Sequence, residues 1–215
     1  MLVIALQLHH QELWPYFRDK LEKLNTPFDL YVTTCVGHPN MAKTIKATFP
    51  NANIKQYPNK GQDIGPFIQT LKRIRNNDYK YLIKLHSKKC HYNIALGNSW
   101  RNALVNALIS SDEQLLSNMR LLETSNAKMC GTKEWCRNAA RDPRPEREIG
   151  NYTFIAGTMF MVDFKTFTEV LPDEKIDRWY AQMPNGYKRG QTFTHRVERL
   201  LGKVITQKGY DVVGV

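Results

Sequence analysis

The chain has 215 residues, enough for one sizeable hydrophobic core and typical of a single α/β domain. Its 31 Lys and Arg against 20 Asp and Glu give a net charge of +11, which favours an anionic partner: a nucleotide, a nucleic acid or an acidic membrane surface. No apolar run approaches the roughly 20 residues of a transmembrane helix, and the start lacks the pattern of a signal peptide. The four cysteines form no CxxC pair, so neither a zinc site nor a disulfide framework is expected. We therefore expect a cytoplasmic protein with reduced thiols.

Strand-like and helix-like segments alternate along the first 90 residues. The apolar patterns predict strands at Val3–Leu8, Phe28–Thr33, Asn53–Gln56 and Tyr81–Leu85. They predict helices at Gln11–Leu24, Met41–Thr48 and Ile64–Arg75. Such alternation favours a three-layer, Rossmann-like α/β/α domain with a mostly parallel sheet.

The second half of the chain is less regular. We expect helices at Trp100–Leu108, Asp112–Thr124, Lys165–Leu171 and Gln191–Leu201. We expect strands at Lys128–Gly131, in Tyr152–Val162 as one strand or a pair, and at the sheet edge within Lys203–Val215. Pro172–Arg189 has no clear pattern, and the charged stretch Lys133–Gly150 is interpreted as a loop, either a lid or a disordered segment. No linker divides the chain, so residues 1–215 are interpreted as one domain.

Four polar residues directly follow the fourth predicted strand: His86, Ser87, Lys88 and Lys89. Ligands of open α/β sheets bind beyond the carboxyl ends of the strands, so these residues favour an anion site, and we expect a phosphate there. The alternative is a strand that ends in a solvated basic loop. Arg101 on the next predicted helix would add charge, although Trp100 and Arg101 also fit a packed aromatic and a surface cation.

A glycine-containing stretch bridges the third predicted strand and the N-terminus of the third predicted helix, and it contains Asn59, Lys60, Gly61, Asp63 and Gly65. The glycines allow close approach of the backbone, and the helix N-terminus offers free N–H groups to an anion or a sugar hydroxyl. Asp63 would accept hydrogen bonds from sugar hydroxyls or, alternatively, cap the helix.

Two further motifs lie in the last third of the chain. The small step Ala156-Gly157-Thr158 inside an apolar run indicates close approach of a ligand or of another backbone, or else a strand bulge. His195 and Glu198 share one face of a predicted helix, where either would act as a general base toward an acceptor hydroxyl. The alternative role for Glu198 is an ion pair with a neighbouring arginine.

Six motifs in this order resemble the rhamnan synthesis protein F family: L-H-H-Q-E-L-W, N-K-G-Q-D-I-G-P-F, K-L-H-S-K-K, W-R, A-G-T-M-F and H-R-V-E-R-L-L-G. The resemblance runs from about residue 4 to about residue 212. The layout is also similar to GT-A glycosyltransferases. It departs from that class where the Asp-x-Asp metal motif is usual, because His86-Ser87-Lys88 stands there.

The resemblance implies a glycosyltransferase that moves a sugar, L-rhamnose, from a nucleotide diphosphate donor to a bacterial surface polysaccharide such as an O-antigen of lipopolysaccharide or a cell-wall rhamnan. It implies a lipid-linked or growing glycan as acceptor, other polysaccharide synthesis enzymes as partners, and peripheral contact with the inner face of the cell membrane. The chain would be the whole enzyme or one module of a longer synthase.

The resemblance also assigns roles to matching residues. The donor pocket would contain Asn59, Lys60, Gly61, Asp63 and Gly65, and the diphosphate would face His86, Ser87, Lys88, Lys89 and Arg101. The acceptor side would contain His9, Trp100, Gly157, Thr158 and Met159. Glu198 is the first choice for the base, with His195 as a second candidate and Asp63 in reserve. Fixed cations would neutralise the leaving diphosphate, so no protein-held metal is favoured, and Mg²⁺ or Mn²⁺ remains the alternative.

Two interpretations from other functional classes also remain for this sequence. One is a non-catalytic sugar-nucleotide-binding or scaffold domain of a polysaccharide synthesis complex, which a missing metal motif permits. The other is a basic nucleic-acid-binding domain. Against the latter, the basic residues gather at predicted strand ends and no recognition motif is present, so we expect weak binding to arbitrary DNA or RNA.

Overall fold

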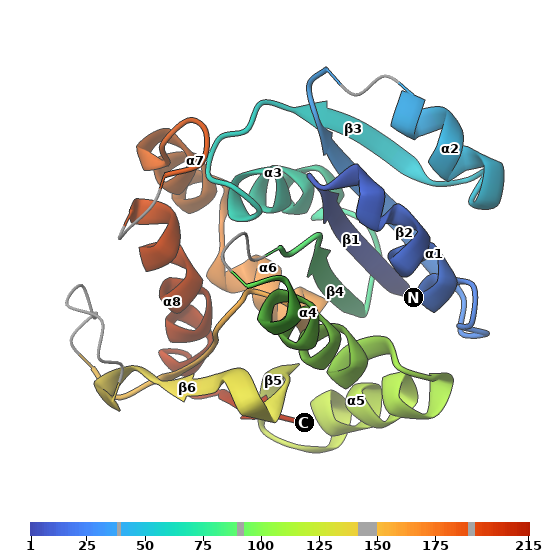
Figure 1. The fold of residues 1–215 in the computed structure, drawn as a ribbon. Coiled ribbons are helices and arrows are strands. Elements are labelled where there is room, and N and C mark those ends of the chain that lie inside the picture. The colour runs from blue at the N-terminus through green and yellow to red at the C-terminus, as the bar shows by residue number, and fades with distance from the viewer. Residues whose placement is uncertain (38–39, 90–92, 142–149, 189–191) are drawn as a thin grey trace.

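The computed structural model describes residues 1–37, 40–89, 93–141, 150–188 and 192–215. Its centre is a seven-stranded sheet in the order β3-β2-β1-β4-β8-β5-β9 (Figure 1). The strands are β1 (Leu2–Leu8), β2 (Phe28–Cys35), β3 (Asn53–Tyr57), β4 (Tyr81–His86), β5 (Ala127–Gly131), β8 (Phe160–Asp163) and β9 (Asp211–Gly214). β8 runs antiparallel to both neighbours, and the other pairings within this sheet are parallel, so the expected mostly parallel sheet is confirmed.

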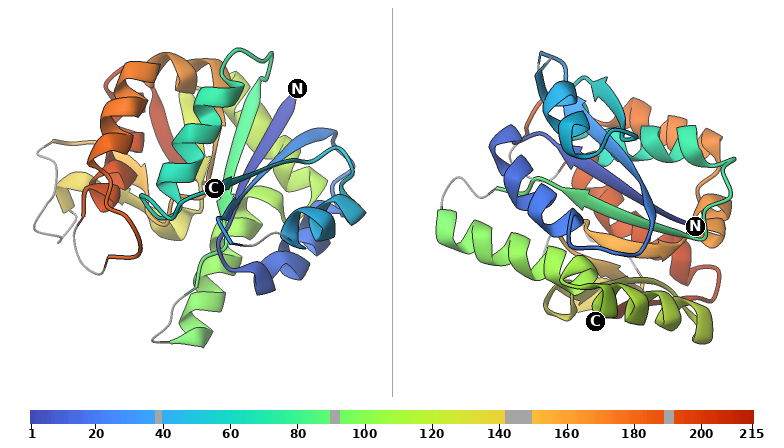
Figure 2. Two further views of the ribbon diagram at one scale, coloured as in Figure 1. Left: turned by 90° about the horizontal axis from the view of Figure 1, so that it is seen from above. Right: turned by 90° about the vertical axis from the view of Figure 1, so that its right-hand side faces the viewer.

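Helices cover both faces of this sheet and complete the three layers (Figure 2). One face packs against α1 (Trp14–Leu21), α2 (Asn40–Thr48), α4 (Ile94–Ile109) and α5 (Asp112–Thr124). The other packs against α3 (Ile64–Ile74), α6 (Phe164–Val170), α7 (Asp173–Gln182) and α8 (Phe193–Thr206). Among the described helices, none is both long and apolar enough to cross a bilayer.

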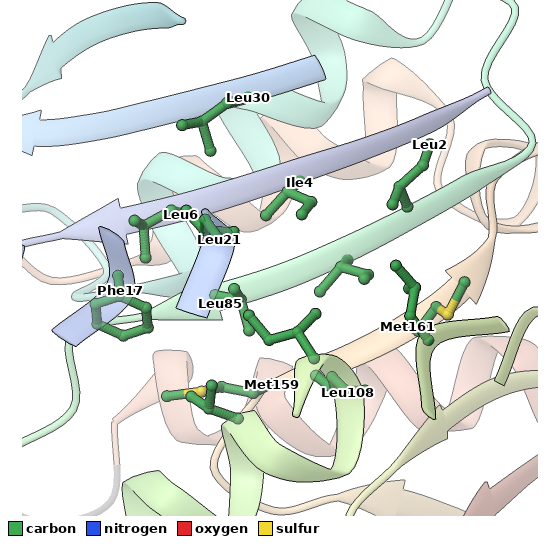
Figure 3. Close-up of a cluster of buried hydrophobic side chains, with 14 of the residues drawn as sticks. Leu2, Ile4, Leu6, Phe17, Leu21, Leu30, Leu85, Leu108, Met159 and Met161 are labelled. Atoms are coloured by element: carbon green, nitrogen blue, oxygen red, sulfur yellow. The ribbon is translucent and has the colours of Figure 1, made fainter. Parts of the chain in front are cut away.

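Alternation along the central strands explains why two cores form. In β1, Leu2, Ile4 and Leu6 point to the first face, whereas Val3 and Ala5 point to the second. All seven β1 residues are buried, as expected of a strand covered on both sides. Figure 3 shows the first core, where side chains from α1 and α4 meet those of the sheet.

Three elements differ from the sequence expectations. α7 forms within the stretch interpreted as irregular, because Ile176 and Trp179 bury one face of it against the second core. The stretch Tyr152–Val162 does hold two strands, β7 (Thr153–Ile155) and β8, but they lie in different sheets: β7 pairs with β6 (Cys136–Asn138). α4 begins at Ile94, earlier than expected, because Asn93 caps it by accepting the Leu96 N–H.

The stretch 133–150 is only partly a loop. Its described portion contains two short 3-10 helices, Lys133–Trp135 and Ala139–Arg141, on either side of β6. The expected lid falls largely on residues 142–149, which lie outside the described residues, as does Gln191, the expected start of the last helix.

The antiparallel β8 determines where the site forms. Lys84 of β4 pairs in register with Phe160, the first residue of β8, so the turn before β8 lies beside the carboxyl end of β4. The parallel strand β1 ends at the same edge, because Gln7 pairs with His86. His9, the residues after β4 and the Gly157–Thr158 turn therefore meet at one edge of the sheet.

Candidate functional site

Two adjoining cavities open at this edge, with volumes of about 680 Å³ and 340 Å³. They share six lining residues: Gln62, Asp63, His86, Lys88, Trp100 and His195. The smaller cavity extends toward the ends of β1 and β4 and reaches His9, Asn59, Ser87 and Lys89. The larger extends toward α8 and β6 and reaches Trp135, Arg137, Gly157, Thr158 and Glu198.

An ion pair joins Asp63 of the shared wall to a lysine buried behind it. Lys84 points inward from β4 with a side chain that is 0% exposed, and its Nζ lies 2.6 Å from Oδ2 of Asp63. The same ammonium donates to the backbone oxygen of Thr158 at 2.8 Å and to its hydroxyl at 3.1 Å. The Thr158 hydroxyl donates to Oδ2 of Asp63 at 2.5 Å. All three ammonium protons therefore have acceptors, and Asp63 Oδ2 receives two of the hydrogen bonds in this cluster.

These contacts set the charge states around the shared wall. Burial alone would raise the pKa of Asp63, but the charge that His86 carries when it is protonated at low pH, the charge of Lys84, and the hydrogen bonds from Lys84 and Thr158 lower it well below its usual range. Burial lowers the pKa of Lys84, an effect that Asp63 opposes. Burial also lowers the pKa of His86 to about 3. At pH 7 His86 is therefore neutral, and Lys84 provides the positive charge beside Asp63.

The turn before β8 connects this pair to α8. The Gly157 N–H donates to Oε2 of Glu198 at 3.0 Å, and the Gly157 oxygen lies 2.8 Å from Nε2 of His86, which donates as the neutral ring. Gly157 has φ 90° and Thr158 φ 52°, both in the left-handed region. A Cβ on Gly157 would lie 2.9 Å from Cδ1 of Leu104, so the close approach of turn and α4 requires glycine.

A stacked tryptophan pair forms another wall. The rings of Trp100 and Trp135 lie 4.5 Å apart at 29°. Nζ of Lys88 lies 3.5 Å from the centre of the Trp100 ring, and the Arg137 guanidinium lies 4.9 Å from that of Trp135. Aromatic faces attract cations, so the stack holds two positive groups at the cavity. One of them, Lys88, lies where the two cavities meet.

Most residues singled out in the sequence come together here. The cavities are lined by His9, Asn59, Asp63, His86, Ser87, Lys88, Lys89, Trp100, Gly157, Thr158, His195 and Glu198. Asp63 makes no capping hydrogen bond at the start of α3, so its alternative role as a helix cap is not observed. Lys89 forms an ion pair with Glu12, and the Ser87 hydroxyl accepts the His10 N–H.

Five of the residues predicted to bind donor or acceptor line neither cavity. Three of them, Lys60, Gly61 and Gly65, lie just before α3 or in its first turn. The Lys60 ammonium turns to the Ala181 oxygen and lies over the Tyr180 ring. A Cβ on Gly61 would be 2.3 Å from Sδ of Met183, and one on Gly65 would be 1.9 Å from the Lys60 oxygen. These glycines therefore serve close packing of the chain on itself and do not face a ligand.

The other two residues that line neither cavity, Arg101 and Met159, are held in place by packing. Arg101 is buried: it donates to the Lys88 oxygen and to Asn98, and its guanidinium lies over Tyr16. It therefore positions the loop after β4 from behind. Met159 is 0% exposed and belongs to the first core, as Figure 3 shows. Residue type alone could not distinguish these inward-facing positions from cavity positions one residue away.

Several residues at the site escaped the sequence analysis, among them Lys84, Trp135 and Arg137. Lys84 carried a usable signal, since a charged residue inside the apolar run Y-L-I-K-L is unusual in a doubly covered strand. Trp135 and Arg137 lay in the stretch interpreted as a loop, and their approach to Trp100 depends on β6 pairing with β7. Local sequence offered no signal for that pairing.

The residues at the end of β4 do not match the donor set of a divalent metal. Mg²⁺ and Mn²⁺ favour carboxylate oxygens, whereas His86, Ser87 and Lys88 follow here. Asp63 is near, but its Oδ2 already accepts from Lys84 and Thr158. Across the described residues, no three His, Cys, Asp or Glu side chains cluster in a way that would hold a metal ion.

Solved structures share the fold at low sequence identity. The 4-diphosphocytidyl-2C-methyl-D-erythritol synthase of Anaerococcus prevotii DSM 20548 is similar with a TM-score of 0.51 and 11% identity, over 100% of this chain and 86% of that one. TarS 1–349 from S. aureus in complex with UDP is similar with a TM-score of 0.50 and 10% identity, over 100% and 57%. These likenesses confirm the expected GT-A-type α/β fold.

Sequence relatives point to one family. Two curated proteins of Xanthomonas campestris pv. campestris, strains B100 and ATCC 33913, both described as uncharacterized protein WxcX, are 24% identical to this chain. The similarity covers 99% of this chain but 32% of each relative, so the chain spans about a third of their length. The sequence model of the family described as rhamnan synthesis protein F matches residues 1–126 of this chain. The chain belongs to the rhamnan synthesis protein F family.

Proposed function

We propose that this chain is a glycosyltransferase domain that moves a sugar, L-rhamnose, from a nucleoside diphosphate to a growing bacterial surface polysaccharide. Family membership and the GT-A-type fold support a glycosyltransferase role. The observation that carries the proposal is the pair of cavities that share Asp63, His86 and Lys88, with the carboxylate of Glu198 in the larger one alone.

The smaller cavity suits the donor nucleotide. It lies beyond the carboxyl ends of β1 and β4, where open α/β sheets bind nucleotides. Lys88 is at its junction with the larger cavity, so a diphosphate placed against Lys88 would direct the attached sugar toward Glu198. The ammonium would offset the charge that develops on the leaving diphosphate. Lys89 adds positive charge at the outer rim, where Glu12 already balances it.

The larger cavity suits the acceptor glycan. Its stacked tryptophans, Trp100 and Trp135, offer apolar surface beside cations, and Glu198 is held there by the Gly157 N–H. In an inverting reaction the acceptor oxygen bonds to the anomeric carbon as the bond to the diphosphate oxygen breaks. Glu198 takes the hydroxyl proton, and the leaving electron pair stays on the nucleoside diphosphate beside Lys88.

The contacts rank the three candidate bases. Asp63 is the weakest candidate, because Lys84 and Thr158 occupy its Oδ2 and lower its pKa. Asp63 fits better as an acceptor for a sugar hydroxyl at the shared wall. His195 caps the start of α8, because its Nδ1 accepts the Thr192 N–H at 3.3 Å, so it is the second choice. Glu198 remains the first.

The acceptor and surroundings follow from the family. We infer a lipid-linked or growing glycan such as an O-antigen or a cell-wall rhamnan, built with other polysaccharide synthesis enzymes at the inner face of the membrane. The net charge of +11 suits an anionic lipid surface, an attraction that salt would weaken. These partners would be those of a whole protein, whereas this chain spans about a third of the length of its curated relatives.

A donor panel tests the proposal. The purified chain is incubated with UDP-, dTDP-, GDP- and CDP-linked sugars, with and without excess EDTA, and release of nucleoside diphosphate is followed. We expect slow hydrolysis of one donor, a nucleoside-diphosphate-linked rhamnose, that survives EDTA. Binding of a donor without turnover would favour a scaffold role, and full loss of turnover in EDTA, restored by Mg²⁺ or Mn²⁺, would refute the metal-independent mechanism.

A further inference from the structure

Lys84 is a buried charge that no step of the proposed reaction uses directly. Its side chain is 0% exposed and lines neither cavity, so it does not touch a ligand. Taking a lysine and an aspartate out of water is costly, and apolar replacements of buried pairs are often neutral or stabilising. Stability alone therefore gives no reason for a lysine at this position of a central strand.

The contacts of Lys84 point to the turn before β8. Two of its three hydrogen bonds go to Thr158, one to the backbone oxygen and one to the hydroxyl. Thr158 has φ 52°, a left-handed conformation that is costly for a β-branched residue. The surroundings must hold such a residue in place, and Lys84 together with Asp63 does so from below.

The same turn holds the carboxylate of Glu198. The residue before Thr158 is Gly157, whose N–H donates to Oε2 of Glu198 and whose oxygen accepts from His86. A continuous set of contacts thus runs from Lys84 through Thr158 and Gly157 to Glu198. On its other side Lys84 fixes Asp63 at the wall that both cavities share.

We propose that Lys84 is a positioning residue of the transfer site: it holds Asp63 and the Gly157–Thr158 turn so that Glu198 stays directed into the larger cavity. The inference rests on the proposed glycosyltransferase function for its effect on turnover. Its effect on the anchoring of Glu198 is independent of that function and is measured separately.

The test removes both charges at once. Lys84→Met alone would leave the carboxylate of Asp63 without its ion-pair partner, so the informative variant is the double substitution Lys84→Met/Asp63→Asn, which keeps an acceptor for the Thr158 hydroxyl. The matched control is Lys72→Met/Asp177→Asn, the same change at an exposed ion pair with a 2.8 Å separation. Thr158→Ala is a second, milder variant that keeps the Lys84–Asp63 pair and loses only the hydroxyl.

Three quantities are measured on each protein: the Tm, the turnover of the donor found in the panel, and hydrogen exchange of the Gly157 amide. We expect Lys84→Met/Asp63→Asn to unfold near the wild-type Tm, to lose about 10²-fold in kcat with donor affinity within a few-fold, and to exchange the Gly157 amide faster. Thr158→Ala should also speed exchange of the Gly157 amide and lower kcat, but to a smaller extent than the double variant. The control should match wild type in all three.

Two results would overturn the inference. One is a folded double variant with wild-type turnover and wild-type Gly157 exchange. The other, if the double variant does not fold, is a Thr158→Ala protein with wild-type Gly157 exchange. A wild-type chain that is inactive on every donor would instead count against the proposed function, and the exchange measurements would still decide whether Lys84 anchors Glu198 through the turn.

Discussion

Gly157 donates its backbone N–H to Oε2 of Glu198 at 3.0 Å, and this one bond ties the turn before β8 to the helix α8 across the larger cavity. The carboxylate is therefore held by a backbone group that has no rotamers of its own. On the far side of the same turn, the Gly157 oxygen accepts from His86 of β4. Gly157 thus contacts both the candidate base and the end of the central strand.

Glu198→Gln should abolish transfer while leaving donor binding intact. The amide can still accept the Gly157 N–H, so the turn keeps its place, but it cannot take the acceptor proton. A lost general base costs about 10²–10⁴-fold in kcat. Steady-state kinetics and donor titration separate the two effects. Full activity in Glu198→Gln together with inactivity in His195→Ala would pass the role of base to His195.

Lys88→Ala should weaken binding of the bare nucleoside diphosphate more than Lys89→Ala does. Lys88 lies at the junction of the cavities, whereas the charge of exposed Lys89 is already met by Glu12. Lys60→Ala is the control, because that ammonium turns away to Ala181. Calorimetric titration at low and high salt measures the effect, which should shrink with salt. Equal losses in all three variants would mean that general surface charge, and no particular lysine, attracts the nucleotide.

Acid should destabilise the protein through His86. Its folded pKa of about 3 lies below the unfolded value near 6.5, so between these two pH values the unfolded chain binds a proton at His86 that the folded chain does not bind. The free energy of unfolding should therefore fall as the pH drops below about 6.5, by at most ~1.4 kcal/mol per pH unit for this group.

Urea unfolding between pH 6.5 and 4.5 covers this effect, because the unfolded aspartates titrate mainly below that window. The chain's five other histidines also titrate within it, so the comparison with His86→Gln is what isolates His86. His86→Gln removes the titrating ring, and its free energy of unfolding should depend less on pH than that of wild type. Identical slopes in the two proteins would show that His86 is not held neutral in the folded state.

Gly157→Ala should destabilise the fold and impair the site. A Cβ there meets Leu104 at 2.9 Å and Nε1 of Trp100 at 3.3 Å, in addition to the strain of φ 90°. Gly209→Ala is a matched control, because Gly209 has φ 82° and nothing within 4 Å of its Cβ position. Strain alone costs about 1–3 kcal/mol, so the excess in Gly157→Ala measures the contact with α4. Equal losses in the free energy of unfolding for both variants would mean that α4 shifts to admit the added Cβ without an energetic penalty.

Local pattern predicted much of the fold, because the strands of the first half are apolar runs and the helices carry amphipathic faces. β1 to β4 and the helices between them appeared close to their expected bounds. α7 did not, since its helical face shows only two buried apolar residues, Ile176 and Trp179. The separation of β7 from β8 depends on pairing partners far away in the chain, which no local period encodes.

The candidate site could likewise be predicted only in part from local sequence. His86, Lys88 and Asp63 could be placed because strand ends and loops before helices gather at one edge of a parallel sheet. Whether a side chain then turns into the cavity depends on packing: Arg101 turns to Asn98 and Tyr16, and Met159 enters the core. Those outcomes are set by contacts between distant segments and not by residue type.

The most direct test of the account is a crystal structure of the chain with the nucleoside diphosphate of its preferred donor. The account predicts that the base and ribose occupy the smaller cavity, near His9 and Asn59, with the diphosphate within hydrogen-bond reach of Lys88 and the larger cavity open beside Glu198. A nucleotide bound away from both cavities, or with its diphosphate remote from Lys88, would contradict it.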